Sequence, residues 1–177
     1  MTAENQTRRS ASASASTAAA PTAAGTAAPQ APAGIDPRGP RFVATITAVI
    51  LFIDVVLGLA GADLAALLLL AVVAATFAWT TIAGIRRHPF AIIFRRVVLP
   101  RLTPTSDRED PRPPTFAQGV GLFVTGVGVI LGLLGIAPAV VIAAAFAFVA
   151  AFLNSAFGFC LGCQIYLLLQ RLRPAAA

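Results

Sequence analysis

The chain has 177 residues, of which 58% are hydrophobic and only 11% are charged. A soluble domain of this size needs more polar residues to cover its surface, so the composition argues against a soluble protein and favours one surrounded by lipid. The formal net charge is +6, and all thirteen basic residues are arginine. These arginines form no stripe with interleaved aromatic residues, so we expect no nucleic-acid partner.

Residues 1–34 are rich in Ala, Ser, Thr, Pro and Gly, with no aliphatic side chain larger than alanine after Met1. Such a segment buries too little apolar surface to offset the entropy of ordering, so we predict a disordered tail. Arg8 and Arg9 lack the hydrophobic region that follows the arginines of an export signal. We therefore do not interpret them as a targeting signal.

Four long hydrophobic segments follow, at residues 42–60, 64–84, 116–136 and 138–169. A helix needs about 20 apolar residues to cross a bilayer, and continuous apolar runs without alternation argue against strands. We predict an all-α membrane protein with a tail, 1–34, and a membrane domain, 35–173. Its four transmembrane helices are expected at about 42–60, 64–84, 116–136 and 138–158, with a short continuation at 159–171.

The connections between helices predict two antiparallel hairpins. The first two helices are joined by three residues, 61–63, and the last two by residue 137, whereas the central connection is about 30 residues long. The arginines of the membrane domain all fall at the termini or in that central connection, on one side of the four spans. By the positive-inside rule, both termini and the central loop are expected in the cytoplasm of a bacterium, with the helices in its cytoplasmic membrane.

The central loop contains a short amphipathic segment, PFAIIFRRVVL, at residues 89–99. Its apolar residues recur at helical spacing, and Pro89 and Pro100 suit its beginning and end. One interpretation is an interfacial helix on the inner leaflet, with lipid-facing basic residues at Arg86, Arg87, Arg95 and Arg96. The other is a loop helix packed on the bundle.

Cys160 and Cys163 are the only cysteines and form a Cys-x-x-Cys in an apolar setting. The last segment, 138–169, would be ~48 Å long as one helix, so it must tilt or break, and Asn154, Ser155 and Gly158 favour a break. The cysteines would then begin a short helix near the inner membrane surface. A thiolate at a helix N-terminus is stabilised, which makes Cys160 the candidate attacking thiol and Cys163 its partner in a disulfide.

Two other uses of the cysteines remain open. The thiols are either half of a metal site or small packing residues. A zinc site needs four ligands, and His88, the only histidine, is better interpreted as an interfacial residue. Two thiolates alone suffice for Cu(I), or for half of a zinc site shared by a dimer. We assign no metal and no cofactor.

Asp54 and the glycines are the remaining features of the spans. A carboxylate inside a membrane helix is costly and marks a candidate functional site, here an intramembrane polar site. The alternative is that Asp54 lies hydrated near the outer rim.

Gly128 and Gly132 have GxxxG spacing, as have Gly158 and Gly162. This spacing favours close helix packing, either inside the bundle or between protomers of a homo-oligomer.

Four motifs resemble a known family: DPRGPRF at 36–42, PRL at 100–102, EDPRPP at 109–114 and FGFCLGC at 157–163. Over about residues 35–173 the chain resembles the bacterial integral-membrane domain-of-unknown-function family DUF4395, which is common in high-GC Gram-positive bacteria. The resemblance implies a small multi-helix membrane protein whose hallmark is the cysteine pair, with a loose association with thiol and sulfur metabolism. It assigns no activity.

Two functions therefore compete. In the first, an integral membrane protein handles thiols, disulfides or sulfur through Cys160 and Cys163, with a cytoplasmic thioredoxin-like or sulfurtransferase partner. In the second, the protein is a non-enzymatic membrane scaffold or small transporter subunit, and the two cysteines only pack. Whether the thiols reach water and change oxidation state distinguishes the two.

Overall fold

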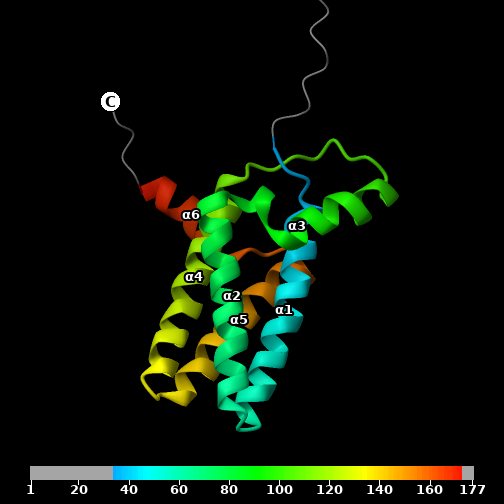
Figure 1. The fold of residues 1–177 in the computed structure, drawn as a ribbon. Helices are drawn as coiled ribbons and strands as arrows, with labels where there is room; N and C mark the ends of the chain where they lie inside the picture. The colour runs from blue at the N-terminus through cyan, green and yellow to red at the C-terminus, as the bar shows by residue number, and fades with distance from the viewer. Residues whose placement is uncertain (1–33, 173–177) are drawn as a thin grey trace, which may run out of the picture. The chain divides into compact units, whose positions relative to one another are not determined.

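Four long helices dominate the computed structural model, which describes residues 34–172 (Figure 1). They are α1 (Arg38–Leu59), α2 (Asp63–Ala83), α4 (Arg112–Leu133) and α5 (Ala137–Phe157), and the shorter helices are α3 (Pro89–Ile93) and α6 (Leu161–Leu172). The described residues contain no strand, only one isolated bridge between Ile35 and Glu109. The predicted class, all-α with four membrane helices, is confirmed. The tail predicted to be disordered lies, apart from Gly34, outside the described residues.

All four long helices are long and apolar enough to cross a membrane. Their outward faces carry large apolar side chains, among them Phe52, Ile82, Phe123 and Phe146, which are exposed. Such side chains are stable on a protein surface only where lipid replaces water. The protein is a multi-pass integral membrane protein.

The four long helices form a ring in the order α1, α2, α4, α5, so that each packs against two neighbours. The core inside this ring consists of aliphatic side chains and alanines: Leu51, Ala66, Leu70, Val73, Val140, Ala143, Ala144 and Ala147. Alanines on α5 let neighbouring helices approach closely. The bundle therefore depends on tight packing of small residues.

The two hairpin turns lie together at one end of the bundle, at the bottom of Figure 1. Gly61 (φ 79°) and Gly135 (φ 85°) supply the left-handed backbone that each turn needs. We call this the hairpin end. The opposite end, the arginine end, carries the first residues of α1 and α4, the central loop and α6, and with them every arginine of the described residues.

Glycines hold the hairpin half of the bundle together. A Cβ on Gly58 of α1 would collide with Val141 of α5, and a Cβ on Gly128 or Gly132 of α4 would collide with Ala143 or Val140 of α5. The GxxxG spacing of Gly128 and Gly132 thus serves contacts inside the bundle. Gly162 likewise contacts Ala117, between α6 and α4.

The central loop begins with a helical arm that continues from α3 to Arg101 through a π-helical turn, Phe94–Val98, and a 3-10 turn. Phe94 is buried against α1, where its ring centroid lies 5.5 Å from that of Phe42. Ile93 and Val97 are exposed. The amphipathic segment is helical and one of its residues packs on the bundle, while its contact with a membrane surface stays a prediction.

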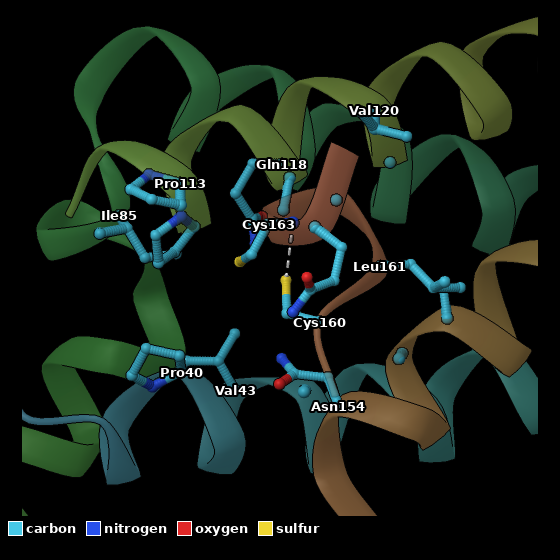
Figure 2. Close-up of a pocket in the computed structure, with 18 of the residues that line it drawn as sticks. Pro40, Val43, Ile85, Pro113, Gln118, Val120, Asn154, Cys160, Leu161 and Cys163 are labelled. Atoms are coloured by element: carbon cyan, nitrogen blue, oxygen red, sulfur yellow. Dashed lines mark hydrogen bonds between the residues drawn. The ribbon is translucent and has the colours of Figure 1, made fainter. Parts of the chain in front are cut away.

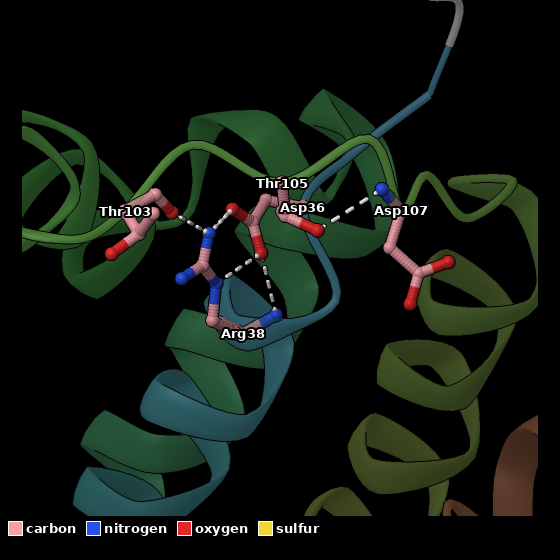
Figure 3. A network of polar contacts seen from close by, with 5 residues as sticks. All are labelled: Asp36, Arg38, Thr103, Thr105 and Asp107. Atoms are coloured by element: carbon pink, nitrogen blue, oxygen red, sulfur yellow. Dashed lines mark hydrogen bonds and ion pairs between the residues drawn. The ribbon is translucent and has the colours of Figure 1, made fainter.

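The rest of the loop is tied to the start of α1 (Figure 3). Arg38 forms an ion pair of 2.9 Å with Asp36 and donates a hydrogen bond of 3.1 Å to the carbonyl oxygen of Thr103. Ile35 and Glu109 exchange two backbone hydrogen bonds of 2.9 Å. These contacts hold the loop over the arginine end, beside the site described next.

Candidate functional site

The chain turns sharply between α5 and α6. Gly158 adopts a left-handed conformation (φ 67°), and its N–H donates to the carbonyl oxygen of Asn154. A side chain at this position would also collide with the guanidinium of Arg41, which lies against Gly158. Glycine therefore both ends α5 and leaves room for a positive charge of α1 beside the turn.

Cys160 caps the N-terminus of α6 with its sulfur. The backbone N–H of Cys163 donates to Cys160 Sγ at 3.3 Å, and the N–H of Gln164 donates to the Cys160 carbonyl oxygen at 3.0 Å (Figure 2). This is the geometry of an N-cap residue, with sulfur in the place of the usual oxygen. The sulfur thus faces the positive end of the helix dipole.

The pKa values of the two thiols are shifted in opposite directions. The hydrogen bond from the Cys163 thiol and the backbone N–H groups of Cys163 and Gly162 lower the pKa of Cys160 to about 7, against the opposing effect of burial. The hydrogen bond to Cys160, together with burial, raises the pKa of Cys163 far above its usual value. The two cysteines are not joined by a disulfide and both are partly buried. Near neutral pH, a large share of Cys160 is therefore the thiolate, whereas Cys163 keeps its proton.

Both cysteines line a cavity of about 640 Å³ in the arginine half of the bundle (Figure 2). Residues of α1, α2, α4 and α5, including Thr47, Phe77, Val124 and Ala147, form its deep part. Glu109 and Asp110 of the central loop lie at its mouth. The thiols are therefore placed between a polar mouth and a largely apolar interior.

Three amide side chains also line this cavity: Gln118 of α4, Asn154 of α5 and Gln164 of α6. Gln118 is held in place because its Oε1 lies 3.0 Å from the hydroxyl of the buried Thr80. Figure 2 shows the Asn154 side chain pointing into the cavity from α5. The walls thus offer fixed hydrogen-bonding groups close to the cysteine pair.

The model of the family described as Domain of unknown function (DUF4395) matches residues 35–171, a range that holds both cysteines and all walls of the cavity. The chain belongs to this family. No curated protein and no solved structure matches it.

Asp54 lies away from the thiols, in the hairpin half of this DUF4395 protein. It is fully buried in the bundle, and neither carboxyl oxygen has a hydrogen-bond partner among the described residues. It does not line the cavity. Asp54 is therefore inside the protein and not at a hydrated rim, and the structure does not bring it together with the cysteine pair.

The arginines that the sequence suggested as lipid-facing, Arg86, Arg87, Arg95 and Arg96, are all exposed and none lines the cavity. Arg86 Nη2 donates to the carbonyl oxygen of Gly34 at 2.8 Å, and Arg95 Nη2 donates to that of Arg86 at 3.0 Å. Two of the four thus also support the loop backbone. The arginine that does line the cavity is Arg41.

His88 is buried beneath the loop and is not at a membrane surface. Its Nδ1 accepts a hydrogen bond of 3.2 Å from the N–H of Phe90 and so caps α3, and burial lowers its pKa to about 4. A neutral, capping imidazole is a structural group. The described residues contain no cluster of three or more His, Cys, Asp or Glu with the geometry of a metal site.

Sequence reasoning missed Arg41, Gln118 and Asn154 as residues of the site. The sequence pattern assigned Asn154 only a part in the break of the last segment, and Arg41 only a place in the DPRGPRF motif. For Gln118 a signal existed, because it is the only amide in the segment 116–136, whose one other polar side chain is Thr125. A lone amide in a membrane helix usually faces a polar cavity or another helix.

Proposed function

We propose that this DUF4395 protein is a membrane thiol–disulfide exchange protein in which Cys160 attacks and Cys163 resolves. The observation that carries the proposal is the position of Cys160 Sγ at the N-terminus of α6, where it accepts the N–H of Cys163 at 3.3 Å. A thiolate is the attacking species in disulfide exchange, and this position favours the thiolate of Cys160.

The reaction proceeds through a mixed disulfide. The Cys160 thiolate attacks one sulfur of a partner's disulfide, and the partner's other sulfur leaves as a thiolate. Cys163 then gives up its proton and attacks Cys160 Sγ, so that the second partner sulfur leaves and the pair becomes a disulfide. The partner is reduced by two electrons and the cysteine pair is oxidised by two. The reverse reaction passes through the same intermediate.

We further propose that the arginine end faces the cytoplasm of a bacterial cell, as the positive-inside rule predicts. A soluble thioredoxin-like protein or a sulfurtransferase is then the partner class that meets the mouth of the cavity. Reporter fusions after Asp63 and Ala137 should behave as external, and fusions after Arg108 and Arg173 as cytoplasmic. An external signal after Arg108 contradicts the orientation.

The function is tested with two matched variants expressed in cells. In Cys163→Ser the mixed disulfide on Cys160 cannot be resolved, so a partner should accumulate covalently on the protein. In Cys160→Ser the remaining thiol lies inside the first turn of α6, where burial still raises its pKa, and it should trap nothing. Non-reducing electrophoresis followed by mass spectrometry of the trapped species measures both.

The asymmetry between the two variants decides the outcome. Equal and negligible trapping by both variants, with both cysteines reduced in cells after an oxidant, would contradict thiol exchange. The scaffold function would then be favoured, with Cys160 and Cys163 as small residues that allow α6 to pack against α4 through the contact of Gly162 with Ala117.

A further inference from the structure

We propose that the cavity beside the cysteine pair binds a lipid-soluble quinone, and that Cys160 and Cys163 pass two electrons to it. The proposal rests on the thiol exchange proposed above and names the small-molecule electron acceptor of the same site. Three properties of the cavity support it: an opening toward lipid, a size and polarity that suit a quinone, and the position of the thiols.

The cavity reaches the lipid-facing surface. Phe146 of α5 is 69% exposed, and Leu161 and Ile165 of α6 are 38% and 42% exposed, yet all three line the cavity. A residue that lines the cavity and also faces outward belongs to its rim. Because these rim residues are apolar and Phe146 belongs to a membrane-spanning helix, the opening is expected to meet acyl chains.

The packing of α4 explains this opening. Toward the hairpin end, Gly128 and Gly132 of α4 contact Ala143 and Val140 of α5. Toward the arginine end, the closest contacts of the α4 glycines change partner, since Gly121 lies against Phe77 and Gly119 against Thr81, both of α2. Between α4 and α5 the cavity occupies the space in this half, with Val120 and Val124 on one side and Ala150 and Ala151 on the other.

The size and polarity fit a ring with an apolar tail. A volume of about 640 Å³ lies in the ordinary range of small-molecule sites. Figure 2 shows Gln118 and Asn154 close to the cysteines, and most of the other lining residues are apolar. The two carbonyl oxygens of a quinone are hydrogen-bond acceptors. The Thr80 hydroxyl, 3.0 Å from Gln118 Oε1, engages only one end of this amide, so an amide N–H of Gln118 remains to donate to such an oxygen.

A charged, water-soluble oxidant fits the apolar part of this cavity poorly, because the only charged residues of the lining are Arg41, Glu109 and Asp110 and the rest of the wall offers no counter-charge. The same holds for a folded protein, which cannot enter a space of this volume. The two openings thus separate two reactants: a soluble thiol protein reaches the pair from the loop side, near Glu109 and Asp110, and a quinone reaches it from the lipid side.

The step balances with one proton taken from water. The Cys160 thiolate and Cys163, whose S–H bond breaks, form one S–S bond. Two electrons and the Cys163 proton pass to the quinone, and water supplies the second proton, so that the two carbonyl oxygens become the hydroxyl groups of a hydroquinone. A reduced partner then restores the dithiol by exchange through Cys160 and leaves as a disulfide.

The test uses the full-length protein, reduced and reconstituted in lipid nanodiscs without oxygen. The probe is a fully substituted benzoquinone with a short alkyl chain, because a ring without free positions cannot be arylated by the thiols. Loss of quinone absorbance and loss of free thiols are followed together. The expected result is one quinone reduced for each cysteine pair, with no mass added to the protein.

A matched pair of tryptophan variants locates the reaction. Ala150 lines the cavity, whereas its neighbour Val149 is exposed on the same helix and does not. Ala150→Trp should slow quinone reduction about tenfold or more because the indole fills the space of the ring, and Val149→Trp should leave the rate unchanged. An aromatic disulfide, which releases two coloured thiolates for each pair, should oxidise both variants like the wild type and so report an intact thiol site.

Each contrary result has a distinct meaning. If the aromatic disulfide oxidises the pair but the quinone does not, the quinone inference is overturned and the proposed exchange function stands. If the quinone reacts equally with Ala150→Trp and Val149→Trp, the cavity is not its site and the inference also fails. If neither oxidant acts, thiol exchange itself fails.

Discussion

The two halves of this bundle are made from the same four helices and are packed in opposite ways. In the hairpin half, Gly58, Gly128 and Gly132 bring helices into contact so close that a methyl group would not fit. In the arginine half, the helices enclose a cavity of about 640 Å³ with two thiols on its wall. One half is closely packed, and the other encloses the cavity that the thiols line.

The comparison shows how a small membrane protein makes a site. In the arginine half the close contacts of the α4 glycines are with α2, and the cavity lies between α4 and α5. There α5 stops at Phe157 and the chain turns at Gly158, so that α6 contacts α4 through Gly162 and Cys160 lies at a helix N-terminus. The break in the membrane helix thus places the reactive thiol on the wall of this space.

The largest expected effect comes from filling the tight half. Gly128→Leu places a side chain where Ala143 and Leu70 already lie, so it should destabilise the bundle by about 3 kcal/mol or more, or prevent assembly. Gly126→Leu is the control, because a Cβ at that position of the same helix meets nothing within 4 Å. Thermal unfolding in detergent measures both. Equal effects of the two variants would show that the hairpin half is not tightly packed.

An intermediate effect, of opposite sign, is expected at Asp54, the polar exception in the tight half. Its buried carboxyl oxygens have no hydrogen-bond partner among the described residues. Asp54→Leu keeps the branching of the side chain and removes the polar atoms, so stability should rise by about 1–3 kcal/mol. Asp54→Asn, which keeps polar atoms, should gain less. A loss of stability in Asp54→Leu would indicate that the carboxyl group has a bound partner.

The smallest effect concerns the thiol in the open half. Since the pKa of Cys160 is lowered to about 7, its alkylation should rise with pH and be half-maximal near pH 7. Cys163→Ala removes the first cause of that shift, the hydrogen bond from the Cys163 thiol, so the midpoint should move upward. Mass spectrometry of iodoacetamide-treated protein follows the reaction. An unchanged midpoint in Cys163→Ala would mean that Cys163 does not tune Cys160.

Some features of the site could be predicted because they depend on residues close together in the chain. Gly158 and the three-residue spacing of the cysteines suggested a break followed by a helix N-terminus, and the sulfur of Cys160 does accept the N–H of Cys163. The burial of His88 and the place of Arg41 against Gly158 were not predictable. Each depends on contacts between segments more than 40 residues apart in the sequence or on the path of a loop.

The sequence by itself determined the four membrane helices, their pairing into hairpins and the end at which the arginines lie. Hydropathy, turn length and charge depend only on residues close together in the chain, so they can be read from the sequence without the structure. Only the tertiary structure decided that Gly128 and Gly132 pack within the bundle, that Asp54 is buried, and that Gln118 and Asn154 share a cavity with the thiols. These outcomes depend on which helix faces meet and how closely, and in nearly uniformly apolar helices hydropathy does not distinguish one face from another.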